Sequence, residues 1–144
     1  MHHTTIAVDL AKNIFKIAVS DRPGRITERH RLSRSKFQRF FAEHLPATVL
    51  LGACSSAHHW ARTLGHQGHN VILLPPHVVR PYVTRNKTDR SDAKAILEAF
   101  RNEDILPVPI KTVNQHVIAS LHRYRSAWLA ERTARINLSP RHPP

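Results

Sequence analysis

Three aspartates in this 144-residue chain have the type and spacing to hold a divalent metal ion. Asp9 lies inside the apolar run 6–10, whereas Asp89 and Asp92 lie three positions apart in the segment 89–101. If that segment is a helix, both carboxylates lie on one face with Cβ atoms about 5–6 Å apart. Carboxylates that close repel each other unless a cation lies between them, and Mg²⁺ and Mn²⁺ prefer oxygen ligands. The pattern is therefore compatible with a metal site.

The same aspartates also have ordinary structural roles. A polar residue such as Asp9 commonly marks the end of a strand and the start of a turn. Asp89 is a suitable N-cap for a helix, and Asp92 then lies in the first turn, where the positive end of the helix dipole stabilises a carboxylate. Spacing alone leaves the structural and the metal-binding interpretations open for all three residues.

Basic residues lie near the pair Asp89 and Asp92, at positions suited to contact phosphates beside a metal. They are Arg80, Arg85, Lys87 and Arg90. For any one of them, the alternative is a solvated surface position. Over the whole chain, 22 lysines and arginines against 10 acids give a net charge of +12. A charge this large predicts a polyanionic partner, with nucleic acid favoured over a membrane surface.

Several other classes of protein are disfavoured. No apolar run approaches the about 20 residues that span a bilayer, and residues 1–5 lack the pattern of a secretory signal. We therefore expect a soluble cytoplasmic protein with no membrane partner.

Cys54 and His58 can align on a helix, but two ligands are fewer than a zinc site normally needs. No Gly-rich phosphate loop and no complete Ser–His–acid set is evident.

Hydropathy patterns predict the strands that must position these residues. A short apolar run at 6–10 and alternating residues at 14–19 and 25–32 predict three strands in an antiparallel meander. Continuous apolar runs predict two buried parallel strands at 48–51 and 71–74. With helices between the later strands, this order predicts a mixed α/β sheet.

Helices are predicted where apolar residues recur at intervals of three or four. The expected helices lie at about 33–45, 55–64, 78–82, 89–101 and 112–137. Leu45 is expected on the apolar face of the first, which Pro46 closes. The last helix is long, with arginines off a narrow apolar stripe that consists of Val113, Val117, Leu121, Tyr124 and Trp128. We expect this stripe to pack against a surface that the chain itself does not supply.

Four segments resemble the insertion-sequence transposases that carry a DEDD motif. They are IAVDLAKNIF at 6–15, LSRSK at 32–36, ACSSAHHWAR at 53–62 and the segment 75–93, and the similarity continues to about Asn137. The resemblance implies a RuvC-like domain of RNase H-like fold, with an antiparallel meander, parallel strands, flanking helices and a long C-terminal helix. It also implies that four acids bind Mg²⁺ or Mn²⁺, that a serine in a separate C-terminal domain attacks DNA, and that a bridge RNA guides target choice.

By position, the resemblance makes Asp9 the first of the four acids and Asp89 and Asp92 the last two. The second acid is missing, because Gly52 stands where the family has Glu, and no residue in 49–56 is acidic. Losing one carboxylate removes negative charge and leaves a coordination position empty. We therefore expect weakened or lost metal binding.

The resemblance also implies a domain organisation. Residues 1–110 form the RuvC-like DEDD domain, 111–137 the helix that leads to the C-terminal domain, and 138–144 a disordered tail outside the family pattern. The expected function is that of a truncated transposase domain whose ancestral role is DNA cleavage and strand transfer, and which is inactive alone. The alternative is a module without catalysis, which binds nucleic acid or pairs through its long helix with itself or with intact transposase.

Overall fold

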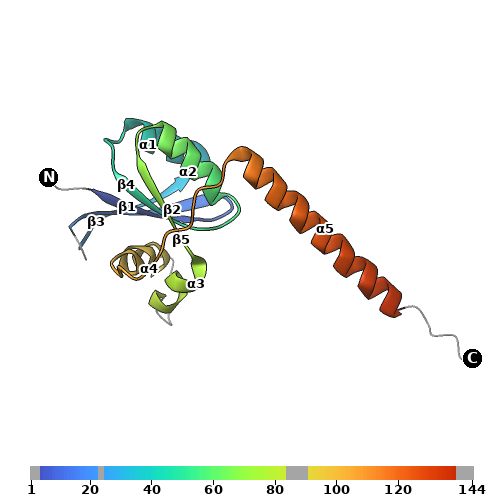
Figure 1. The fold of residues 1–144 in the computed structure, drawn as a ribbon. Helices are drawn as coiled ribbons and strands as arrows, with labels where there is room; N and C mark the ends of the chain where they lie inside the picture. The colour runs from blue at the N-terminus through green and yellow to red at the C-terminus, as the bar shows by residue number, and fades with distance from the viewer. Residues whose placement is uncertain (1–3, 23–24, 84–90, 139–144) are drawn as a thin grey trace, which may run out of the picture. The chain divides into compact units, whose positions relative to one another are not determined.

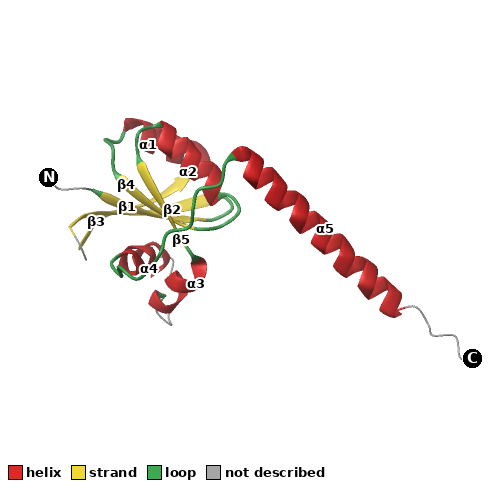
Figure 2. Ribbon diagram, in the orientation of Figure 1, coloured by secondary structure: helices red, strands yellow, loops and turns green. Residues whose placement is uncertain are grey.

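The computed structural model describes residues 4–22, 25–83 and 91–138. The chain divides into two compact units, Met1–Ile110 and Lys111–Pro144. The first unit contains a sheet with flanking helices, and the second contains one long helix (Figures 1 and 2). In chain order the elements are β1 (Thr5–Leu10), β2 (Ile14–Arg22), β3 (Arg25–Ser33), α1 (Arg34–Glu43), β4 (Thr48–Gly52), α2 (Ala57–His66), β5 (Asn70–Leu74), α3 (Pro76–Val79), the 3-10 helix η1 (Arg80–Tyr82), α4 (Ser91–Phe100) and α5 (Val113–Leu138).

The five strands form one mixed sheet in the order β3-β2-β1-β4-β5. β1 pairs antiparallel with β2, and β2 with β3, which confirms the predicted meander. β1 pairs parallel with β4, and β4 with β5, which confirms the two parallel strands. This order with its flanking helices is the RNase H-like α/β fold that the resemblance implied.

Alternation along the strands sorts the side chains between the two faces of the sheet. On one face, Val8, Val49 and Leu51 pack with buried side chains of α1 and α2. On the other face, Ala7 and Leu50 pack with buried side chains of α4. Figure 1 shows α1 and α2 on one side of the sheet and α4 on the other. We call these the α1/α2 face and the α4 face.

Aromatic side chains hold the helices on the α1/α2 face. Phe15 of β2, Phe37 of α1 and Trp60 of α2 meet edge to face, with ring centroids 4.7, 5.3 and 4.9 Å apart. All three side chains are buried. Such rings contribute both a large apolar area and a preferred geometry, so this cluster fixes α1 and α2 against the sheet.

One buried histidine has a structural role. Nδ1 of His69 accepts a hydrogen bond from the Ala47 backbone N–H at 3.3 Å, and Nε2 donates to the Phe41 carbonyl at 3.0 Å. Both ring nitrogens are therefore satisfied inside the core. The imidazole ties the end of α1 to the segments that precede β4 and β5.

Two predicted helices differ from the observed ones. α1 ends at Glu43, and Leu45, predicted on its apolar face, is 80% exposed. The residue before a proline is disfavoured in the helical region, so Pro46 ends the helix earlier than expected. The predicted helix 78–82 is instead α3 followed by η1, because Pro81 lacks the N–H that a continuing α-helix requires.

The long helix α5 has 26 residues and follows the prediction closely. The side chains of its apolar stripe are each more than half exposed: Val113 60%, Val117 53%, Leu121 61%, Tyr124 63% and Trp128 70%. Among the described residues, no helix is both long and apolar enough to cross a membrane.

Candidate metal site

Asp9 lies on the α4 face, one residue before the end of β1. Residues two apart on a strand share a face, and Ala7 packs beneath α4, so the Asp9 side chain lies on that face too. The side chain is 29% exposed, and its Oδ2 atom lies 3.8 Å from Nζ of Lys16 on β2. This carboxylate is thus half-buried and accessible at the carboxyl ends of the parallel strands, where open α/β sheets usually bind ligands.

Asp92 lies in the first turn of α4 and is half-buried. α4 runs opposite to β1, because Leu97 and Phe100 in its second half line the same pocket as Thr5 at the start of β1. The first turn of α4 therefore lies toward the end of β1 that carries Asp9. The fold brings these two acids to the same face and the same end of the sheet.

The third predicted acid, Asp89, lies outside the described residues, as do Arg85, Lys87 and Arg90. Within 4–22, 25–83 and 91–138, no group of three or more histidine, cysteine or acidic side chains is arranged to hold a metal ion. Asp9 and Asp92 thus supply carboxylate oxygens, which suit a hard cation, but a Mg²⁺ site also draws ligands from water or substrate phosphates.

Gly52 lies beside Asp9 on the neighbouring strand. β1 and β4 run parallel with Val8 opposite Leu51, so the next residues along the two strands are Asp9 and Gly52. Leu50, two residues earlier, packs on the α4 face, so a side chain at position 52 also projects there. Among the residues that the structure describes, a Cβ atom built on Gly52 meets nothing within 4 Å. The fold therefore leaves open space beside Asp9, at the position where the resemblance expects a glutamate.

Two further residues border this end of the sheet. Lys16 is directly opposite Asp9 in the β1–β2 ladder, and its side chain is 17% exposed. Lys16 was not identified as a site residue from the sequence. Its position beside Asp9 follows only from the register between β1 and β2. Arg80, predicted to bind nucleic acid, is exposed on η1, which packs against α4.

The cysteine and histidine pair lies elsewhere. Cys54 is exposed, with Sγ 3.4 Å from the Ser56 Oγ, and His58 is buried on α2. Since α2 packs on the α1/α2 face, the sheet separates His58 from Asp9 and Asp92.

Comparison with known proteins shows a relationship along most of the chain. A family model described as a transposase, of the DEDD type found in IS110, matches residues 6–140. A probable family 20 transposase of Pseudomonas aeruginosa is 40% identical over 137 residues, which cover 95% of this chain and 40% of that protein. The transposase for insertion sequence element IS1328 of Yersinia enterocolitica is 38% identical over 134 residues, covering 93% of this chain and 40% of that protein.

A third relative agrees. The transposase for insertion sequence element IS1111A of Coxiella burnetii is 36% identical over 132 residues, covering 92% of this chain and 36% of that protein. The chain thus spans 36% to 40% of the length of these three curated relatives. No solved structure matches it. With the family model matching residues 6–140 and a relative 40% identical over 95% of the chain, the chain belongs to the IS110 family of DEDD transposases.

Proposed function

We propose that this chain is the acid-bearing domain of an insertion-sequence transposase, in which Asp9, Asp89 and Asp92 bind Mg²⁺ or Mn²⁺ for DNA cleavage and strand transfer. The supporting observation is that Asp9 and Asp92 share one face and one end of the sheet in a DEDD-family chain. Asp9, Asp89 and Asp92 would hold the divalent ion, which would supply Lewis-acid chemistry at the scissile phosphate. The proposed setting is DNA in the bacterial cytoplasm.

The basic residues near the acids are proposed to neutralise the DNA backbone. Arg80 supports this role, because it is exposed on η1 beside the helix that carries Asp92. Arg85, Lys87 and Arg90 share the role by their place in the sequence. Phosphate contacts of this kind position nucleic acid without reading its sequence. A bridge RNA, implied by the resemblance, is a further proposed partner.

The 144-residue chain alone is proposed to have little or no nuclease activity and no transposition activity. Gly52 removes one of the four carboxylates, which lowers the affinity for a divalent ion. The attacking serine belongs, by the resemblance, to a separate C-terminal domain, and the relatives are much longer than this chain. Metal activation is thus compromised in this segment, because one expected ligand is absent at position 52.

Cleavage of branched DNA in Mg²⁺ or Mn²⁺ tests this proposal. We expect no product above that of the Asp9→Asn variant, and robust Asp9-dependent turnover would refute the inactivity. The metal site is tested separately by Mn²⁺ titration of the Gly52→Glu variant with and without Asp9→Asn, followed by electron paramagnetic resonance. Asp9→Asn should abolish the bound signal, whereas Asp104→Asn, in an exposed loop, should leave it unchanged. Equal binding by all three proteins would overturn the metal assignment.

A second candidate function is a module without catalysis that pairs through α5. The observation that favours it is the exposed stripe of Val117, Leu121, Tyr124 and Trp128, whose 4-3-4 spacing is typical of a two-stranded coiled coil. Sedimentation equilibrium should then show a dimer that Leu121→Lys dissociates and the off-stripe Arg125→Gln does not. A monomer in all three proteins would exclude pairing of this chain with itself.

A further inference from the structure

The β-ladder register places a row of basic side chains beside Asp9. Asp9 pairs with Lys16 across β1 and β2, and Lys16 pairs with Arg31 across β2 and β3. Directly paired residues on neighbouring strands project to the same face. Because strands in a sheet are about 4.8 Å apart, Arg31 lies about 10 Å across the sheet from Asp9, with the Lys16 ammonium between them.

A second pair of rungs adds Arg29 to the row. Ala7 pairs with Ala18, and Ala18 pairs with Arg29. Ala7 and Ala18 are both buried under α4, so Arg29 projects from the α4 face as well. Arg29 and Arg31 are exposed, and β3 is the outermost strand of the sheet. The basic row therefore consists of Lys16, Arg29 and Arg31 and extends from Asp9 to the edge of the sheet.

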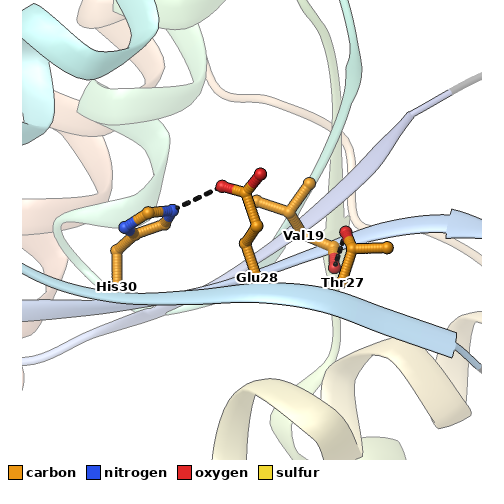
Figure 3. Close-up of polar contacts among 4 residues, drawn as sticks. All are labelled: Val19, Thr27, Glu28 and His30. Carbon is orange, nitrogen blue, oxygen red and sulfur yellow. Dashed lines mark hydrogen bonds and ion pairs between the residues drawn. The ribbon is translucent and has the colours of Figure 1, made fainter.

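The acid of the same strand lies on the opposite face. Glu28 and His30 pair with Val19 and Ile17, whose side chains belong to the α1/α2 face. They stand on one side of β3, with the Glu28 carboxylate 2.9 Å from His30 Nε2 (Figure 3). Strand alternation thus separates the charges of β3, so that two arginines share the face of Asp9 and the carboxylate does not.

We propose that the basic row Lys16, Arg29 and Arg31 binds the phosphodiester backbone of the DNA strand that leads to Asp9. This inference rests on the proposed function, and it adds an interface on β2 and β3 to the one expected near residues 80–90. Arg29 and Arg31 are two residues apart, about 6.6 Å along a strand. A DNA strand carries one phosphate per about 3.4 Å of axis, so about 6.6 Å corresponds to two phosphate steps. The two guanidinium groups therefore match phosphates two steps apart on one strand, which arginine contacts with its planar set of donors.

The test is the salt dependence of duplex DNA binding in EDTA, which makes the readout independent of any metal. Each phosphate neutralised contributes about −0.9 to the slope of log K against log salt. We expect the R29Q/R31Q double variant to reduce that slope by nearly two and to weaken binding roughly 60-fold at 0.1 M salt. The matched control is K36Q/R39Q, which removes two exposed charges from α1 on the other face and should leave the slope unchanged.

A charge-conserving variant and an RNA ligand serve as two further controls. R29K/R31K keeps both charges on the exposed edge strand and should retain the wild-type slope, whether or not the glutamine variant folds. An RNA hairpin of equal length should lose less affinity than duplex DNA in R29Q/R31Q, and loss confined to RNA would overturn the assignment to a DNA strand. Wild-type binding with an unchanged slope in R29Q/R31Q overturns this inference alone. No binding by the wild type overturns it together with the proposed DNA contacts.

Discussion

Gly52 and Asp9 are lateral neighbours on parallel strands, one step beyond the paired residues Leu51 and Val8, and both positions face α4. A side chain at position 52 thus projects beside the Asp9 carboxylate, which we propose as a metal ligand. The open space around Gly52 shows that its neighbours do not exclude a larger residue there. The glutamate that the resemblance expects at position 52 would therefore lie beside Asp9 on this sheet.

Restoring that acid should restore metal affinity. We predict that Gly52→Glu tightens Mn²⁺ or Mg²⁺ binding about tenfold or more, because the ligand charge of a site sets its affinity for a hard cation. Isothermal titration calorimetry measures the change. Gly52→Gln is the matched control, since it has the same shape without the charge. Equal affinities for the two variants would show that position 52 does not reach the ion.

Lys16 should oppose metal binding at Asp9. Its ammonium lies 3.8 Å from Asp9 Oδ2, so an arriving divalent cation meets like charge. Two unit charges about 4 Å apart in a water-like dielectric interact by about 1 kcal/mol. A divalent ion at that range is therefore disfavoured by about 2 kcal/mol, which corresponds to roughly thirtyfold in affinity. We predict that Lys16→Gln strengthens Mn²⁺ binding of the Gly52→Glu variant by about this factor, while Lys16→Arg leaves it nearly unchanged. Weaker binding in Lys16→Gln would mean that Lys16 supports the site instead.

His69 should be required for stability. His69→Ala removes the acceptor of the Ala47 N–H and the donor to the Phe41 carbonyl, both inside the core. A buried polar group left unsatisfied costs about 1–3 kcal/mol, so we predict a loss of about 2–4 kcal/mol in the free energy of unfolding. Urea denaturation measures it. The exposed His66→Ala should change stability by less than about 0.5 kcal/mol, and equal losses would contradict the assignment.

Two glycines near the end of α2 should respond in opposite directions to alanine. Gly68 has φ of 90°, a left-handed conformation that alanine adopts only with strain, so Gly68→Ala should destabilise the protein by about 1–2 kcal/mol. Gly65 lies within α2, where an added Cβ meets nothing within 4 Å. Gly65→Ala should therefore stabilise the protein by up to about 1 kcal/mol. Thermal unfolding of both variants checks the signs, and shifts in the same direction would contradict the backbone argument.

The amino-acid sequence by itself determined the elements and much of their order. Alternation gave the meander strands, continuous apolar runs gave β4 and β5, and the long helix was predicted within one residue at each end. These features depend on local periodicity, which is a property of the sequence and does not require tertiary contacts. Asp9 was a candidate from its place in an apolar run, but only the resemblance to a family favoured the metal-binding interpretation over the structural one. Gly52 was found only through that resemblance.

The tertiary structure decided which residues become neighbours. Asp9, Lys16 and Arg31 form one row only because two strand registers align them, and the burial of Ala7 and Ala18 under α4 assigns Arg29 to the same face. A shift of one residue in either register moves every side chain of that strand to the other face. Registers are set by packing between segments far apart in the chain, so the basic row beside Asp9 is a property of the folded sheet.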